Sequence, residues 1–136
     1  MSRGWDSDGD GAGTRSGKLE RLQRLKRGFT AEAMAALLLM AKGYRILARR
    51  HRTPYGEIDI IAVRGNRLAF VEVKRRASLA EAEAALTEGQ ARRIGDAAEH
   101  WVAKRPRYRE HEMGLDAVLV VPKRWPRHMP NVMAGV

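Results

Sequence analysis

Hydrophobic and polar positions divide the chain into alternating helical and extended segments. Residues 30–42 are mostly apolar and are followed by Gly43, which predicts a buried helix. Residues 44–50 then alternate between apolar and polar side chains, as a strand does. Residues 51–56 contain a proline and a glycine, so we predict a loop there.

Two residue pairs mark the starts of further helices. Ser78 precedes Glu81 and Thr87 precedes Gln90, and each pair has the spacing of a capping box. The first pair predicts a short turn or helix and the second a longer helix, over residues 78–85 and 87–104.

The remaining apolar segments predict strands. Residues 56–76 contain two apolar runs joined by a Gly-Asn pair, which is the pattern of a hairpin. Residues 115–121 form a strongly apolar strand that ends before a proline, and a short edge strand is expected near residues 128–132. The order helix, strand, strand, strand, helix, strand predicts an α/β domain with a central mixed β-sheet flanked by helices.

The N-terminal segment differs from the rest of the chain. Residues 1–17 are polar and glycine-rich without periodicity, so we expect them to be disordered, and residues 18–136 to form a single domain with a basic C-terminal tail. Within that domain, residues 18–28 place leucines between basic residues and predict a short basic helix. No signal peptide is recognisable, and the longest apolar run, residues 33–41, is too short to span a bilayer. We therefore expect a cytoplasmic protein with no membrane partner.

The hairpin carries charged residues in unexpected places. A two-residue turn at residues 65–66 sets the register so that Asp59 opposes Glu72 and Glu57 opposes Lys74. Because side chains alternate between the two faces of a strand, all four charged residues share one face. The other face is apolar except beside the turn.

Carboxylates placed in this way need a partner. The Cβ atoms of opposed residues lie roughly 5 Å apart, and like charges there are destabilising. Burying an isolated carboxylate costs several kcal/mol, and a strand pair that is apolar on both faces is usually buried. A Mg²⁺ or Mn²⁺ ion held by Asp59 and Glu72 would offset that cost. The alternative is a hairpin whose charged end projects past the core, with Glu57 and Lys74 as an ordinary cross-strand ion pair.

The overall charge narrows the choice of partner. The chain has 26 lysine and arginine residues against 16 aspartate and glutamate residues, a net charge of +10, and no cysteine. Such a basic domain favours polyanions, with nucleic acid first and an acidic membrane surface second, and the lack of cysteine excludes disulfides and thiolate metal sites. A metal ion beside a lysine in a basic protein indicates phosphodiester hydrolysis.

Arginines flank the charged end of the hairpin. They are Arg50, Arg52, Arg75 and Arg76. This placement suits contacts to the phosphates around a site, and the alternative is a solvated basic rim. Trp101, Tyr108 and Trp125 are candidates for stacking on unpaired bases, although Trp101 is better explained as a core residue of its helix.

Several of these segments together resemble a known family. Asp59, followed after a short hairpin by Glu72-Val73-Lys74, resembles the core of PD-(D/E)xK nucleases. More narrowly, "GEIDIIA" and "FVEVKRR", with Glu32 on the preceding helix and "KGYRILARR" before them, look like the YraN-like family of bacterial proteins. That family is related to restriction endonucleases and archaeal Holliday-junction resolvases, and the resemblance extends over about residues 28–121.

The resemblance implies a restriction-endonuclease-like fold and specific roles. Asp59 and Glu72 would hold the metal, Lys74 would serve the attacking water, and Glu32 would supply a further catalytic and metal-binding carboxylate. For Glu32 the alternative is an acid in the first turn of a helix, where acids are favoured anyway. Glu57 fits the family's GEID run, and pairing with Lys74 is its alternative role.

Two positions depart from the family pattern. Where such proteins usually carry a lysine on the helix after the core, this chain has Gln90, which either helps the site or only belongs to the capping pair with Thr87. His51 stands where an asparagine is expected, and we assign it no role in the site.

These observations predict a metal-dependent nuclease that acts on DNA, with branched or single-stranded forms as candidate substrates. The alternative is a non-catalytic nucleic-acid-binding protein that keeps the nuclease fold. A scaffold or membrane-surface protein that uses residues 18–27 for a partner is less favoured. Because related resolvases act as dimers, a homodimer is also compatible with the resemblance.

Overall fold

The computed structural model describes residues 17–18, 20–21, 24 and 28–134 of the chain. The sequence predicts that residues 1–17 are disordered. Except for Gly17, these residues lie outside the described ones. The positions described within the predicted basic helix are helical: Lys18, Glu20, Arg21, Arg24 and Gly28.

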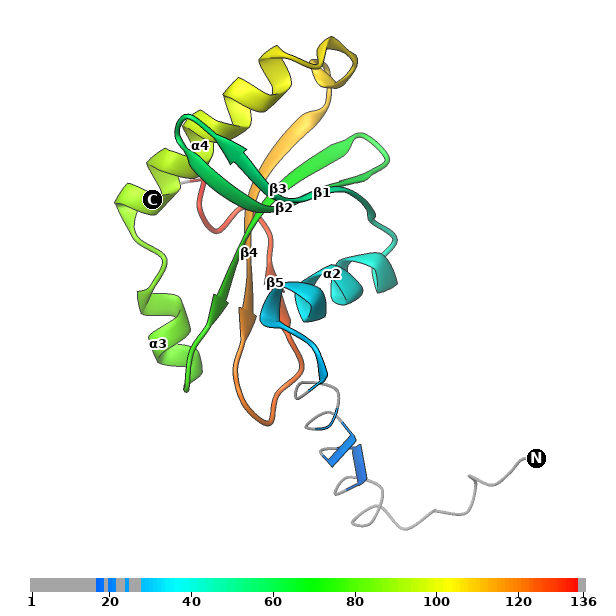
Figure 1. The fold of residues 1–136 in the computed structure, drawn as a ribbon, viewed down its shortest axis with the longest axis vertical. Coiled ribbons are helices and arrows are strands. Elements are labelled where there is room, and N and C mark those ends of the chain that lie inside the picture. Colours follow the sequence, from blue (N-terminus) through cyan, green and yellow to red (C-terminus); the bar gives the residue numbers. More distant parts are fainter. Residues whose placement is uncertain (1–16, 19, 22–23, 25–27, 135–136) are drawn as a thin grey trace, which may run out of the picture.

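Helices and strands follow one another along the domain in the predicted order (Figure 1). The elements are α2 (Ala31–Ala41), β1 (Arg45–Thr53), β2 (Gly56–Arg64), β3 (Arg67–Arg75), α3 (Leu79–Ala84), α4 (Glu88–Ala103), the 3₁₀ helix η1 (Pro106–Tyr108), β4 (Glu112–Val120) and β5 (Arg127–Met129).

The strands form one five-stranded mixed sheet in the order β1-β2-β3-β4-β5. Neighbouring strands are antiparallel except β3 and β4, which are parallel and are connected through α3 and α4. Helix α2 packs on one face and α4 on the other. The predicted α/β fold with a central mixed sheet flanked by helices is thereby confirmed, and it is consistent with a restriction-endonuclease-like fold.

The helices begin where the sequence predicts. Ser78 and Thr87 accept hydrogen bonds from the backbone N–H groups of Glu81 and Gln90, both at 3.2 Å. Thr30 does the same at the start of α2. Each side chain thus satisfies one of the free N–H groups at a helix start.

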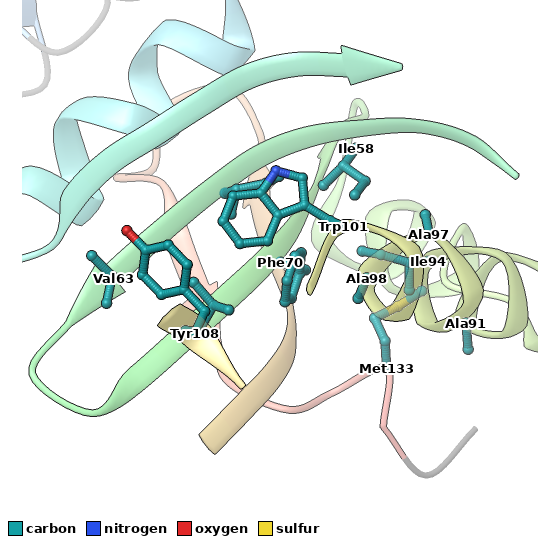
Figure 2. Packing of buried hydrophobic residues seen from close by; sticks show 12 residues of the cluster. Ile58, Val63, Phe70, Ala91, Ile94, Ala97, Ala98, Trp101, Tyr108 and Met133 are labelled. Carbon is teal, nitrogen blue, oxygen red and sulfur yellow. The ribbon is translucent and has the colours of Figure 1, made fainter. Parts of the chain in front are cut away.

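The core has an aromatic centre between the sheet and α4 (Figure 2). Trp101 of α4 is only 3% exposed and lies against Phe70 of β3 and Tyr108 of η1, with ring centroids 5.8 and 5.2 Å away. Trp101 is therefore a core residue, as its helical position predicts.

Strand β1 is longer than the sequence indicates. The predicted loop at residues 51–56 is wrong over His51, Arg52 and Thr53, which pair with β2 and leave a connection of two residues. The charged sequence hides this strand because its backbone hydrogen bonds to β2 do not depend on apolar side chains. Strand β5 lies at the sheet edge close to its predicted place.

A buried charged cluster joins the strands β3, β4 and β5. Asp116 is fully buried and accepts two hydrogen bonds from the Arg67 guanidinium, at 2.7 and 2.9 Å, and one from the Asn131 N–H. His128 Nε2 lies 2.8 Å from the same carboxylate. Although burial acts to raise the pKa of Asp116, these hydrogen bonds hold it at about 2.

In the part of the chain that the structure describes, no helix combines the length and the apolar character needed to cross a membrane.

Candidate active site

The hairpin of β2 and β3 has the predicted register next to its turn and loses it farther away. Arg64 pairs with Arg67, and the pairing continues to Ile60 and Val71. Beyond that point β2 runs on beside β1, and β3 runs on beside β4 (Figure 1). The charged residues thus lie where the two strands part.

This separation corrects the predicted partner of Glu57 and the predicted face of Ile58. Glu57 does not oppose Lys74; it is paired in register with Arg52 of β1, and Arg52 Nε lies 3.9 Å from its carboxylate. Regular alternation along β2 predicts Ile58 on the same face as Ile60, yet Ile58 packs with Ile61 in the cluster against α4. The strict alternation of faces thus fails in the part of β2 beyond its ladder with β3.

Glu72 and Lys74 form the centre of the candidate site on β3. They are 7% and 8% exposed, and Lys74 Nζ lies 3.1 Å from Glu72 Oε2. Arg93 of α4 also reaches that oxygen, at 3.8 Å. A buried carboxylate is thus held between two cations, one from its own strand and one from the helix above it.

Asp59 lies at the parting of the strands. The ladder ends before it, so it does not pair with Glu72 across the hairpin, and its Oδ2 accepts a hydrogen bond of 2.8 Å from the Val73 N–H instead. Burial, and to a smaller extent the negative charges of Glu72, Glu57 and Glu32, raise the pKa of Asp59 to about 6 against the lowering effect of the Val73 hydrogen bond. A carboxylate with a pKa raised in this way is a candidate for a functional role.

Arg93 is a site residue that the sequence did not reveal. Its guanidinium donates to the Glu57 carbonyl oxygen at 3.3 Å as well as facing Glu72. It passes over Gly56, where a Cβ atom would stand 2.8 Å from the Arg93 Cδ. The glycine of the "GEID" run therefore leaves room for this arginine. The spacing of one helical turn between Gln90 and Arg93 is the signal that could have indicated it.

Gln90 occupies the first turn of α4. Its backbone N–H bonds to Thr87, as the capping pattern predicts. Its side-chain Oε1 is buried and has no hydrogen-bond partner among the described residues. The second bond of a capping box, from the Thr87 N–H to the Gln90 side chain, is thus not formed, and a buried acceptor without a partner calls for a ligand or a water.

Glu32 and the arginines of β1 form a separate group. The Glu32 carboxylate receives hydrogen bonds from Arg49 Nε at 3.0 Å and Arg50 Nε at 2.6 Å. Arg50 has a positive φ of 51° within β1, a backbone conformation that non-glycine residues rarely adopt. Glu32 thus stands in the first turn of α2, where the helix dipole favours an acid, with its charge already matched by two arginines.

The exposed arginines around this region differ in whether they form an ion pair. Arg52 faces Glu57, whereas Arg75 and Arg76 stand exposed at the end of β3, one and two residues beyond Lys74. Neither Arg75 nor Arg76 takes part in an ion pair with another described residue.

The available oxygens suit a hard divalent cation. Oδ1 of Asp59 and Oε1 of Glu72 have no partner among the described residues, and the Gln90 Oε1 is free in the same sense. Within the described ranges, no group of three or more histidine, cysteine, aspartate or glutamate residues is arranged to hold a metal ion. Asp59 and Glu72 would supply the one or two carboxylates with which proteins usually bind Mg²⁺ or Mn²⁺, while water and phosphate complete the coordination.

Comparison with known proteins identifies the family. The sequence model described as "Uncharacterised protein family UPF0102" matches residues 31–120, which include Glu32, Asp59, Glu72 and Lys74. The chain belongs to the UPF0102 (YraN) family. The resemblance found in the sequence is thereby confirmed.

Several UPF0102 proteins are similar over most of their length. A UPF0102 protein of Rhodopseudomonas palustris (strain BisB18) is 55% identical over 111 residues, which cover 82% of each chain. A UPF0102 protein of Bradyrhizobium diazoefficiens is 54% identical over 110 residues, 81% of this chain and 83% of that protein. One of Nitrobacter winogradskyi is 52% identical over 109 residues, 80% of this chain and 92% of that protein.

Proposed function

We propose that this protein is a metal-dependent nuclease that hydrolyses DNA phosphodiester bonds. The observation that carries the proposal is the group at the parting of β2 and β3: the buried pair Glu72 and Lys74 beside Asp59, whose pKa is raised to about 6. Buried charges and mutually repelling carboxylates lower the stability of a fold. Their presence supports a role in chemistry.

The side chains would divide the work according to their positions. Asp59 and Glu72 would hold Mg²⁺ or Mn²⁺, which when bound lowers the pKa of a water and polarises the phosphate. Lys74 Nζ, 3.1 Å from Glu72, would hold the attacking water or a phosphate oxygen and match the negative charge that develops there. The Gln90 amide oxygen would accept a hydrogen bond from a water at the site.

Glu32 is proposed as a further carboxylate of the site. Its bonds to Arg49 and Arg50 fix its position, and its negative charge contributes to raising the pKa of Asp59. The arginines would also attract the DNA backbone toward the site. Together with Arg52, Arg75 and Arg76, Arg50 would contact phosphates on either side of the scissile bond.

One observation favours a second candidate function. Within the described residues no ready group of three metal-binding side chains exists, and Lys74 and Arg93 already neutralise Glu72. A nucleic-acid-binding protein that has kept the nuclease fold without hydrolysis would tolerate such an arrangement, because binding depends on the arginines alone.

Cleavage assays separate the two candidates. The wild-type protein is incubated with Mg²⁺ or Mn²⁺ and with duplex, single-stranded, flap and four-way DNA. We expect metal-dependent cleavage of at least one substrate, and a loss of about a hundredfold or more in Glu72→Gln and Lys74→Met, since each removes a group that acts in the transition state.

A surface substitution on α4 serves as the control. Glu99 is exposed, so Glu99→Gln is expected to cleave like the wild type. Salt-dependent DNA binding without cleavage of any substrate would support the binding protein and count against the nuclease.

A further inference from the structure

The connection between β4 and β5 exposes a tryptophan. Trp125 has 63% of its surface exposed, whereas Trp101, the other tryptophan of the described region, is 3% exposed. Large aromatic side chains usually bury their surface in a monomer. Trp125 is thus a candidate contact for a ligand.

The loop that carries Trp125 has little conformational freedom. Prolines stand at positions 122 and 126, and each fixes its own φ angle. Pro122 is followed by Lys123 at φ 63°, the arrangement of a tight turn with proline second and a left-handed residue third. Pro126 is buried and anchors the other end. The backbone on both sides of Trp125 is thus restricted, which lowers the backbone entropy that the loop loses on binding.

Beside Trp125 lies a cavity of about 550 Å³, within the range of small-ligand pockets. Apolar side chains form most of its wall, and two arginines stand at it. The apolar residues are Leu79, Leu119, Val121 and Pro126, and the arginines are Arg124 and Arg127. The cavity can thus take a flat, largely apolar group that carries a negative charge nearby.

The cavity is close to the candidate active site. Lys74 pairs with Leu119 across β3 and β4, and Leu119 pairs with Arg127 across β4 and β5. Residues paired in this way point to the same face, so the three lie in one row across the sheet. With strands about 4.8 Å apart, the backbones of Lys74 and Arg127 are roughly 10 Å apart. Figure 1 shows the loop at the same end of the sheet as the end of β3.

Positive charge surrounds the cavity and continues toward Lys74. Lys123, Arg124 and Arg127 are exposed, and in the described part of the chain none of them takes part in an ion pair. Arg75 and Arg76 stand at the end of the neighbouring strand β3. A phosphate backbone that passes between the cavity and the site therefore meets exposed positive charge at the cavity and at the end of β3.

We propose that Trp125 and this cavity bind an unpaired nucleobase of the DNA whose phosphodiester lies at Lys74. The base stacks on the indole, and Arg124 and Arg127 contact its flanking phosphates. Because it refers to a scissile bond, this inference rests on the proposed nuclease function. It specifies the substrate class: DNA with an unpaired nucleotide beside the cleavage position, as in a single strand or at a junction.

The features of the cavity favour an unpaired base over a duplex. Bases in a duplex are stacked on one another and offer no free face to a tryptophan, whereas every unpaired base has one. Helix α3, which borders the cavity through Leu79, has only six residues and does not provide a long recognition helix for the major groove.

Binding measured without divalent metal tests the inference. A fluorescently labelled single strand of twelve nucleotides and its duplex are titrated, in the presence of EDTA, with the full-length protein. We expect Trp125→Ala to weaken single-strand binding about tenfold, because base stacking on an aromatic residue accounts for such a change. Trp125→Phe should keep most of the affinity, and duplex binding should change less than about twofold.

The matched control is another exposed aromatic residue. Tyr55, in the β1–β2 connection, is 49% exposed and lies outside the cavity, so Tyr55→Ala should bind the single strand like the wild type. The inference is overturned if Trp125→Ala binds the single strand normally, or if it loses equal affinity for both DNA forms.

Failure of this inference differs from failure of the proposed function. Metal-dependent cleavage together with unchanged single-strand binding by Trp125→Ala overturns only the base pocket. A selective loss of single-strand binding in Trp125→Ala, with no cleavage by the wild type, overturns only the nuclease and leaves a single-strand-binding protein.

Discussion

Asp59 lies on β2, just beyond the point where β2 and β3 separate. Its carboxylate receives one backbone hydrogen bond, from Val73. The pKa of Asp59 is raised to about 6 in the folded protein, from an ordinary pKa of 3.8 in the unfolded chain. Asp59 therefore keeps its proton in the folded state at a pH where the unfolded chain has lost it. Between about pH 4 and 6 the native state therefore binds more protons than the unfolded state. Stability falls as the pH rises through this window.

The first prediction is that Asp59→Asn stabilises the metal-free protein at pH 7.5. Asparagine keeps an oxygen for the Val73 N–H and removes a poorly solvated charge. We expect a gain of about 1 kcal/mol, or about 4 °C in melting temperature, at pH 7.5 and none at pH 4. Thermal unfolding followed by circular dichroism measures both. A lower melting temperature of the variant at pH 7.5 would mean that the ionised carboxylate stabilises the fold.

The sequence predicted some residues of the site and not others. The alternation of apolar and charged positions drew attention to Asp59, Glu72 and Lys74, because that pattern is local to two strands. Arg93 went unrecognised, since its approach to Glu72 depends on how α4 packs over Gly56. Such a contact between distant segments leaves no mark in the periodicity.

At the scale of elements, the sheet depends on how its strands change partners. The Gly-Asn turn and the apolar runs predicted the first part of the β2–β3 ladder correctly. They could not predict where the ladder ends, because that is decided by the competing pairings of β2 with β1 and of β3 with β4. The corrected partner of Glu57 is Arg52, which lies in the last three residues of β1, the part of that strand predicted to be a loop.

The second prediction concerns the buried charged cluster that joins β3, β4 and β5. Asp116→Asn removes the negative partner of Arg67, whose side chain is 17% exposed, and leaves that cation poorly compensated. We expect a loss of about 3 kcal/mol in urea unfolding at pH 7. Asp96→Asn, an exposed change on α4, should have almost no effect.

The pH dependence of this contribution follows from the pKa of Asp116. That pKa is about 2, below the ordinary value of 3.8, so the carboxylate stabilises the fold fully above about pH 4. Its contribution is lost as the pH falls toward 2. The wild type and Asp116→Asn should therefore differ least in acid. An equal difference at pH 7 and at pH 2.5 would contradict this assignment.

At the scale of the whole molecule, the positive charge is the feature that concerns a partner. The net charge of +10 is large for 136 residues, and exposed arginines stand around the candidate site on β1 and at the end of β3. Charge of this kind attracts DNA regardless of its sequence and is screened by salt. The cytoplasmic location and a homodimer stay predictions from the sequence.

The third prediction is that Arg75 and Arg76 contact phosphates. Replacing both by alanine should weaken DNA binding and lower the slope of log K against log salt by about 2, one unit for each lost contact. Fluorescence anisotropy between 50 and 200 mM salt, roughly the range over which such contacts dominate, measures the slope. An unchanged slope would place these arginines outside the DNA path.

Titration of Mn²⁺ into the wild type and Asp59→Ala, followed by calorimetry at pH 7.5 and pH 5, tests the central claim most directly. The wild type should bind the ion at pH 7.5 and about tenfold more weakly at pH 5, where Asp59, with its pKa near 6, is mostly protonated. Asp59→Ala should show no such binding at either pH. A wild type that binds no Mn²⁺, or an Asp59→Ala variant that binds it equally well, would contradict a metal site at the parting of β2 and β3.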